Sequence, residues 1–327
     1  MLKKIMLVTL GIVLVLLLGG FVLVNLKYDR TFDAPFPNIK ASKDSAVIAR
    51  GRYLVYGPAH CAHCHSQKSD YQNVDKGLET SLKGGYDFVL PIGNLYAPNI
   101  TPDVETGIGK YSDGEIARSL RYGIRHDGRA IIDIMPFYEL SDEDLTAIIS
   151  YLRSIVPVKN KRPENNWNLM GKIALSFMIK PTGDGNVEKA PPIDSTAAYG
   201  KYIASSIANC RGCHSERDLM TGAYVGKEFS GGQTFEVIDR NGNTVKGKHM
   251  VTPNLTFDKA TGRMSDWSKE DFINRFRKGK IIEGSIMPWG PYSRMSDVEL
   301  TALYKFFSTL EPVNKKVPLG IQEGDPL

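Results

Sequence analysis

The first long hydrophobic stretch of the chain covers residues 5–24 and contains no charged residue. A helix needs about 20 apolar residues to cross the hydrocarbon core of a bilayer. Lys3 and Lys4 precede the stretch, which predicts a cytoplasmic N-terminus by the positive-inside rule. A signal peptide would have a shorter apolar region, of about 7–15 residues, and a small-residue cleavage site. No such site occurs before Lys27, so the pattern favours an uncleaved membrane anchor over residues 1–26.

Helical patterns follow a polar, proline-containing tether at residues 27–44. The segment that begins at Ser45 and the segment near 112–122 are both expected to be helical. A third helix is expected to begin at Ser141, where an S-x-x-acid cap precedes apolar residues that share one helix face, namely Leu145, Ile148, Ile149 and Leu152. The chain between these helices is rich in Gly, Pro and Asn, which predicts loops and few strands.

The second half of the chain repeats the first. A Gly-x-Tyr motif begins at Gly51 and again at Gly200, 149 positions later. A Pro-Asn-x-Thr motif begins at Pro98 and again at Pro253, 155 positions later. The order of matching segments is kept, which indicates one domain used twice. We therefore expect a first domain at 45–158, a linker at 159–195, a second domain at 196–315 and a C-terminal tail at 316–327.

The linker contains an apolar stretch at residues 167–178 that is too short to span a membrane. We expect this stretch to pack on a domain surface. The alternative is contact with the bilayer interface or with a partner subunit.

A C-x-x-C-H pattern occurs twice and points to haem chemistry. This pattern is the attachment site of covalent haem in c-type cytochromes. The two sulfurs can bond to one porphyrin edge, and the histidine then reaches the iron as the proximal ligand. The residues are Cys61, Cys64 and His65 in the first motif, and Cys210, Cys213 and His214 in the second. These motifs use all four cysteines of the chain, so the sequence predicts two covalently bound haems c and leaves no cysteine for a disulfide.

Other uses of a C-x-x-C pair are a zinc site and a thiol redox pair. Neither explains the histidine directly after both pairs, or the methionines further along the chain.

Met135 and Met287 are the candidate sixth ligands of the two irons. Met135 lies 70 residues after His65, and Met287 lies 73 residues after His214, each within Ile-Met-Pro. A single methionine usually fills a gap in a core, but the matched positions favour axial ligation, which raises the potential of a haem. The other histidines (His60, His63, His126 and His249) are expected to be motif or loop residues.

Several polar residues are predicted to surround the haems. Arginines recur at near-helical intervals between 118 and 129, which indicates a solvated basic face, propionate pairing or docking of an acidic partner. Arg121 and its counterpart Arg277 are the candidates for propionate pairing. Four further residues are expected either to form hydrogen bonds beside the haems or to build turns, namely Asn99, Thr101, Asn254 and Thr256.

The composition is that of an ordinary globular protein, with 42% hydrophobic and 24% charged residues. The net charge is +5, but Lys3 and Lys4 belong to the membrane segment and the haem propionates add negative charge. The sequence therefore gives no case for nucleic-acid binding.

Together these segments resemble the multihaem cytochrome c subunits of membrane-bound bacterial alcohol, aldehyde and gluconate dehydrogenases. The matching sequences are CAHCH at 61–65, APNITPD at 97–103, ETGIG at 105–109, IMP at 134–136, SDEDLTAIISYLRS at 141–154, WNLMGKIALSF at 167–177 and CRGCHSERDLMTG at 210–222. The resemblance implies a mainly α fold in which each domain is a class I cytochrome c domain that holds His/Met haem. Together with the apolar N-terminal stretch and the internal repeat, it predicts an N-terminal transmembrane helix plus two tandem class I cytochrome c domains. Members of this group usually carry a third haem domain and are often attached to the membrane in another way.

The resemblance also implies a function. We expect a membrane-anchored dihaem cytochrome c that relays electrons at the periplasmic face of the bacterial cytoplasmic (inner) membrane. Its redox partners would be a dehydrogenase subunit or quinol-oxidising donor and an oxidase or other cytochrome. The alternatives are a dihaem enzyme of the peroxidase or thiosulfate-dehydrogenase type, and a sensor or assembly factor. A peroxidase needs an open iron site, and a thiosulfate dehydrogenase needs a cysteine ligand beyond the motifs.

Overall fold

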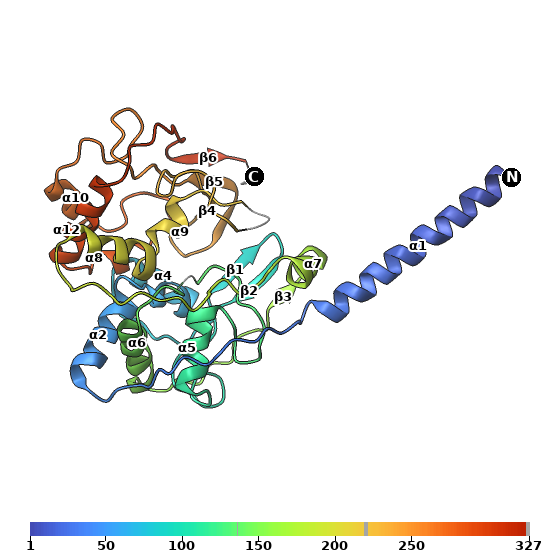
Figure 1. Cartoon of the computed structure of the whole chain (residues 1–327), viewed down its shortest axis with the longest axis horizontal. Helices are drawn as coiled ribbons and strands as arrows, with labels where there is room; N and C mark the ends of the chain where they lie inside the picture. Colours follow the sequence, from blue (N-terminus) through green and yellow to red (C-terminus); the bar gives the residue numbers. More distant parts are fainter. Residues whose placement is uncertain (136, 219–221, 325–327) are drawn as a thin grey trace.

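The computed structural model of the chain describes residues 1–135, 137–218 and 222–324. A long helix, α1 (Leu2–Lys27), projects from a body in which the first half of the chain lies beside the second (Figure 1). Within the described ranges, α1 is the one helix long and apolar enough to cross a membrane, a test that a signal sequence would also pass. The predicted apolar N-terminal helix is confirmed.

Short helices separated by loops make up most of the body. The first half contains α2 (Ser45–Tyr56), α3 (Cys61–His65), the 3₁₀ turn η1 (Lys68–Asp70), α4 (Tyr71–Asp75), α5 (Asp113–Tyr122), α6 (Asp142–Ser154) and α7 (Leu169–Phe177). The second half contains α8 (Ala197–Tyr202), the π-helical turn η2 (Ile203–Ile207), α9 (Cys210–His214), α10 (Lys269–Arg277), α11 (Trp289–Tyr292) and α12 (Asp297–Ser308). The three predicted helices of the first half are confirmed as α2, α5 and α6.

Serine caps fix where several of these helices begin. The Ser141 hydroxyl accepts a hydrogen bond from the Asp144 N–H at the start of α6. Ser112 and Ser296 form full capping boxes at α5 and α12, because a glutamate three residues later bonds back to each serine. The predicted apolar face of α6 is buried, with exposures of 0–4% at Leu145, Ile148, Ile149 and Leu152.

Each half has a pair of crossing helices that depends on a glycine. A Cβ at Gly51 in α2 would lie 1.9 Å from the Ala147 carbonyl oxygen in α6. A Cβ at Gly200 in α8 would lie 2.0 Å from the Ala302 carbonyl oxygen in α12. The repeated Gly-x-Tyr motif therefore marks the close approach of two helices in each half.

Two small antiparallel sheets complete the body. The first has the order β1-β2-β3, formed by β1 (Asp87–Leu90), β2 (Gly93–Tyr96) and β3 (Asn166–Trp167). The second has the order β4-β5-β6, formed by β4 (Thr234–Ile238), β5 (Thr244–Val251) and β6 (Ile321–Glu323). Asp87 pairs with Tyr96 in the first sheet, and Thr234 pairs with Val251 in the second.

The segments expected as tether, linker and tail are attached to the body. Ile39 is buried in a cluster with Ile116 and Ile149. In the linker, β3 pairs with β2, and α7 packs against the end of α1, where the Ser176 hydroxyl donates to the Val24 carbonyl (3.2 Å). β6 extends the second sheet.

The core is continuous between the halves. One cluster contains buried residues from α2 and α6 together with residues from α8 and α12. A polar network crosses the same junction: the Arg50 guanidinium lies 2.9 Å from Asp144 and 3.6 Å from Glu299. Tyr202 donates a 2.9 Å hydrogen bond to Asp144.

Candidate haem sites

The two C-x-x-C-H motifs form the short helices α3 and α9. The residue before each helix, His60 or Asn209, has a left-handed backbone conformation with φ of 40° and 48°, which turns the chain sharply into the motif. Burial raises the pKa of Cys61 to about 12 and, together with the charge of nearby Cys213, raises that of Cys64 to about 12. Such thiols are not the exposed, low-pKa thiolates of a redox pair.

The first motif opens onto a cavity of about 700 Å³. Cys61, Cys64 and His65 line this cavity together with Met135, which lies far along the chain. Much of the remaining lining is apolar and comes from several segments, including Ile100, Ile108, Ile148, Leu152 and the linker residues Trp167 and Leu175. Two sulfur atoms, an imidazole and a thioether around an apolar cavity fit a covalently attached haem.

Each candidate proximal histidine is oriented by a backbone carbonyl. The Nδ1–H of His65 donates to the Pro98 carbonyl at 2.9 Å, and that of His214 donates to the Pro253 carbonyl at 3.1 Å. A hydrogen bond at Nδ1 leaves Nε2 free to bind a metal. Burial lowers the pKa of both rings, that of His214 to about 4, so both are neutral as a ligand must be.

Asn99 and Thr101 hold the loop that presents the Pro98 carbonyl. The Asn99 amide donates to the Val158 carbonyl (2.7 Å), and the Thr101 hydroxyl donates to the Asn99 side-chain oxygen (2.8 Å). Asn99 also lines the cavity, so it both builds this turn and borders the candidate haem site.

Asn254 and Thr256 repeat this arrangement in the second half. The Asn254 amide donates to the Val313 carbonyl at 2.8 Å, and the Thr256 hydroxyl donates to the Asn254 side-chain oxygen at 2.8 Å. Each Pro-Asn-x-Thr motif thus fixes the carbonyl that orients a histidine.

The candidate methionines lie in loops before α6 and α11. Met135 and Met287 are partly buried and pack against the shared core, as do Cys61 and Cys210. The Met287 N–H donates to the Ser285 hydroxyl at 3.3 Å. The proline that follows Met135 in the sequence motif, Pro136, lies outside the described residues.

Comparison with known protein families identifies one segment of the chain. Residues 48–155 match the family described as cytochrome c. This segment of the chain is a cytochrome c domain.

Similarity to curated proteins extends beyond the cytochrome c domain. The chain is 29% identical to the cytochrome c subunit of alcohol dehydrogenase (quinone) from Gluconobacter oxydans, over 86% of this chain and 58% of that protein. It is 26% identical to the gluconate 2-dehydrogenase cytochrome c subunit from Pantoea cypripedii, over 82% of this chain and 60% of that protein. It is 29% identical to the fructose dehydrogenase cytochrome subunit from Gluconobacter japonicus, over 81% of this chain and 50% of that protein. The chain therefore spans less than two thirds of the length of these relatives.

The two arginines predicted to meet propionates, Arg121 and Arg277, each form hydrogen bonds within the protein. In the cytochrome c domain, Arg121 donates to the Leu140 carbonyl and to Asp142, both at 2.9 Å. Arg277 donates to the Ser293 carbonyl and to Asp297, both at 2.6 Å. Each arginine therefore ties the end of one helix to the start of another.

Other arginines line the cavity of the cytochrome c domain, namely Arg30, Arg125, Arg129 and Arg162. Arg125 and Arg129 belong to the near-helical series in the sequence. Arg30 and Arg162 come from the expected tether and linker, and no pattern in the sequence indicated them.

Three of the remaining histidines have hydrogen-bond partners consistent with motif or loop positions, whereas His63 packs on the Tyr71 ring at 5.5 Å and its buried Nδ1 has no partner among the described residues. His126 stacks on Tyr111 at the edge of the cavity, and its Nε2 lies 3.0 Å from the tyrosine hydroxyl. His249 bonds to the Gly324 carbonyl, and His60 bonds to the Pro58 carbonyl. Among the described residues, no group of three or more His, Cys, Asp or Glu side chains is arranged to hold a metal ion, as a zinc site would require.

The two motifs lie near each other across the junction of the halves. The rings of His60 and Tyr292 are 5.4 Å apart, and the Tyr292 hydroxyl donates to the Ala208 carbonyl at 2.6 Å. Tyr292 thus contacts residues just before both motifs.

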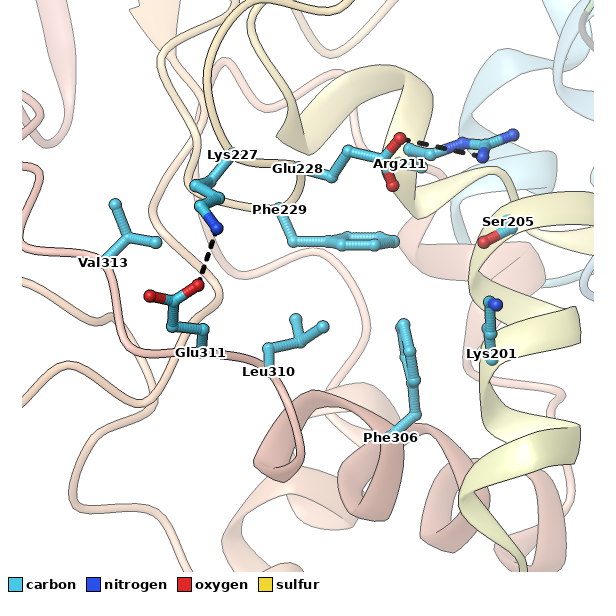
Figure 2. Close-up of a pocket in the computed structure, with 10 residues that line it drawn as sticks. All are labelled: Lys201, Ser205, Arg211, Lys227, Glu228, Phe229, Phe306, Leu310, Glu311 and Val313. Carbon is cyan, nitrogen blue, oxygen red and sulfur yellow. Dashed lines mark hydrogen bonds and ion pairs between the residues drawn. The ribbon is translucent and has the colours of Figure 1, made fainter.

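A second pocket, of about 410 Å³, adjoins the second motif (Figure 2). Arg211 of that motif and the ion pair between Lys227 and Glu311 (2.6 Å) line it, together with Phe229 and Phe306. Neither His214 nor Met287 belongs to this lining, so the pocket is separate from the second set of candidate iron ligands.

Proposed function

We propose that the chain is a membrane-anchored dihaem c-type cytochrome that relays electrons. One observation carries the proposal: in each half, the histidine after a C-x-x-C pair donates its Nδ1–H to the proline carbonyl of a Pro-Asn-x-Thr loop. The same five-residue helix, loop and crossing helix pair recur on both sides. This repetition supports tandem haem domains at 45–158 and 196–315.

Each half would hold one haem through its own residues. Cys61 and Cys64 would form thioether bonds to the first haem, and Cys210 and Cys213 to the second. His65 with Met135, and His214 with Met287, would be the axial ligands. A bound haem with His/Met ligands supplies one-electron redox chemistry at a raised potential.

Arg125, Arg129 and Arg162 are proposed to meet the propionates of the first haem. These arginines line the cavity, whereas Arg121 does not belong to its lining. Arg125 and Arg129 also pair with Asp127, at 3.3 and 2.7 Å. Burial lowers the pKa of Arg162, and a propionate beside it would compensate for its buried charge.

The relatives suggest the redox partners of this chain, and α1 suggests its attachment to a membrane. The relatives are named as cytochrome subunits of alcohol, gluconate and fructose dehydrogenases. We infer that this chain accepts electrons from a dehydrogenase subunit or quinol-oxidising donor and passes them to an oxidase or other cytochrome. α1 would anchor the chain in the bacterial cytoplasmic membrane, with the haem domains on the periplasmic face.

Mass spectrometry of the purified protein tests the haem count. The expected result is two covalent haem additions. Cys61→Ala should remove the haem of the first half and leave the other. A wild-type protein with one haem, or with haem that acid-acetone extracts, would contradict the dihaem proposal.

N-terminal sequencing and membrane fractionation test the anchor. We expect the mature protein to retain α1 and to remain in the membrane after a high-salt wash. Replacement of residues 1–26 by a cleavable signal should release a soluble protein with an unchanged haem spectrum. A mature N-terminus near residue 27 in the wild-type protein would show that α1 is a signal sequence.

Ligand binding separates an electron carrier from a dihaem enzyme. If both irons have six ligands, the wild-type protein should bind carbon monoxide and cyanide weakly and should not turn over peroxide or thiosulfate. Turnover above about 1 per second, within the usual enzyme range, together with a high-spin iron, would favour the enzyme instead.

A further inference from the structure

The segment that carries Met135 has little regular structure of its own. Residues 131–135 and 137–140 contain no helix or strand. Two of the backbone hydrogen bonds within it are short-range contacts, from Ile134 to the Ile132 carbonyl (2.7 Å) and from Phe137 to the Met135 carbonyl (3.1 Å). A ligand loop of this kind needs neighbours to hold its methionine in place.

Two carboxylates close to Met135 in the sequence supply such contacts, because both form ion pairs with arginines of the second half of the chain. Asp133 pairs with Arg217 at 2.7 Å, and Glu139 pairs with Arg211. Arg211 stands between the two cysteines of the second motif, and Arg217 follows His214 by three positions. The loop of the first candidate iron ligand is therefore tied to the haem motif of the second half.

These ion pairs are better protected from solvent than ordinary surface pairs. Side-chain exposures are 18% and 21% for Arg217 and Asp133, and 15% and 36% for Arg211 and Glu139. Both guanidinium groups also pack on the Tyr224 ring, at 4.9 Å for Arg217 and 5.4 Å for Arg211. A partly buried charge that loses its partner destabilises its surroundings far more than an exposed one does.

The loop of Met287 has more support within its own half. The Ser285 hydroxyl accepts hydrogen bonds from the Met287 N–H (3.3 Å) and from the Trp289 indole (3.1 Å). The Arg275 guanidinium lies 3.4 Å from the centre of the Trp289 ring. The Met287 loop also contacts the first half, through the ion pair of Lys280 with Asp75 (2.7 Å) and the close approach of Gly290 to the Val74 carbonyl. Breaking the pairs of Asp133 and Glu139 would leave these contacts of the Met287 loop in place, so we expect the two methionines to respond differently to that change.

We propose that Arg211 and Arg217 are positioning residues for Met135, so that the iron–thioether bond of the first half depends on the second. The inference rests on the proposed function, in which Met135 is an axial ligand. Through these contacts, a change at the second motif reaches the ligand, and hence the potential, of the first haem.

Arg217→Gln and Asp133→Asn in the full-length, haem-loaded protein test this inference. Each variant should lose the far-red band of methionine-ligated ferric haem at one of its two haems. Each should also bind imidazole at that iron about tenfold more tightly, the ratio that 1.4 kcal/mol produces. The potential of that haem should fall as well.

Lys227→Gln is the matched control. It removes a cation of the same half, whose pair with Glu311 is exposed at 65% and 72% and is visible in Figure 2. The control should keep both bands and the wild-type affinity for imidazole. Wild-type spectra and affinity in both Arg217→Gln and Asp133→Asn would overturn the inference.

Double variants identify which iron has changed. Arg217→Gln should add nothing to the imidazole binding of Met135→Ala, but should open a second iron in Met287→Ala. If Arg217→Gln instead opened a second iron in Met135→Ala and added nothing in Met287→Ala, Arg217 would act on the second haem. That result would overturn this inference and leave the proposed function standing. Imidazole binding in Met135→Ala that equals wild type would instead overturn the ligand assignment, and this inference with it.

Arg217→Lys distinguishes positioning from loss of folding. It keeps the charge without the planar guanidinium fork, and should recover part of the far-red band. Haem stoichiometry and far-ultraviolet circular dichroism should equal wild type in every variant. Loss of one haem in Arg217→Gln but not in Arg217→Lys would mean that Arg217 serves haem attachment, and would overturn the positioning role.

Discussion

At the scale of single residues, each candidate iron site combines groups with different constraints. The histidines are fixed by hydrogen bonds to Pro98 and Pro253, which leave one ring nitrogen for the iron. The methionines depend on loops, whose positions are set by surrounding contacts. We therefore expect the thioether bond to be the more easily lost of the two axial bonds.

Met287→Ala should open the second iron and lower the potential of that haem, because the thioether that raises it is lost. Redox titration should then resolve one unchanged and one lowered potential, and carbon monoxide should bind at a single iron. Met170→Ala is the control, since the Met170 side chain is 66% exposed on α7. Two unchanged potentials in Met287→Ala would show that Met287 is not a ligand.

Asn254→Ala should destabilise the protein, because Asn254 is fully buried and joins Thr256, Thr261 and the Val313 carbonyl. Its removal leaves buried polar groups unpaired, which costs about 1–3 kcal/mol. Urea unfolding of the haem-loaded protein measures this loss. Asn186→Ala is the control, since Asn186 bonds to Asp184 at an exposed position. Equal stability in the two variants would count against the structural role of the Pro-Asn-x-Thr loop.

At the scale of elements, the crossing helices of each half hold the haem motif. α2 leads into the motif of the first half and packs on α6, and α8 with η2 leads into that of the second half and packs on α12. The crossing is close because Gly51 and Gly200 have no side chain. An added methyl group must therefore push the helices apart.

Gly200→Ala should lower the free energy of unfolding by about 1–3 kcal/mol, the usual cost of overpacking a core. The new Cβ would lie 2.0 Å from the Ala302 carbonyl oxygen, and backbone cannot move aside as a flexible side chain can. Thermal unfolding followed at the haem absorbance measures the change. Lys201→Ala, at the next and exposed position of α8, should stay near wild type. An equally stable Gly200→Ala would contradict the close crossing.

At the scale of the whole molecule, the two halves share one core and a polar network. Arg50, Asp144 and Glu299 meet where α2 and α6 face α8 and α12. Burial acts to lower the pKa of Arg50, but Asp144 and Glu299 more than compensate and raise it above its usual value. The guanidinium therefore stays charged and depends on these carboxylates.

Asp144→Asn should weaken the junction, because it removes one charged partner of a largely buried guanidinium. We expect a loss of about 3 kcal/mol, measured by urea unfolding with haem absorbance and far-ultraviolet circular dichroism as probes. Arg50→Met combined with Asp144→Leu and Glu299→Gln should restore part of the stability, since all three charges of the network are then absent. A triple variant less stable than Asp144→Asn would show that the network contributes specific attraction beyond charge compensation.

Much of this protein is determined by the sequence alone. The apolar segment that forms α1, the helices α2, α5 and α6, and the Ser141 cap of α6 were predicted correctly, as was the mainly helical fold that the resemblance implied. The haem motifs, with Cys61 to His65 and Cys210 to His214, were also found in the sequence. These features depend on residues close together along the chain, because periodicity, caps and C-x-x-C-H spacing are local.

Only the tertiary structure decided which distant groups meet. In the tertiary structure Arg121 pairs with Asp142, and Arg162, which no pattern in the sequence indicated, lines the cavity. The tertiary structure also joins Asp133 to Arg217, 84 positions later. Arginine side chains are long and find partners wherever folding brings a carboxylate within reach, so the spacing of charges along the chain does not determine their pairing.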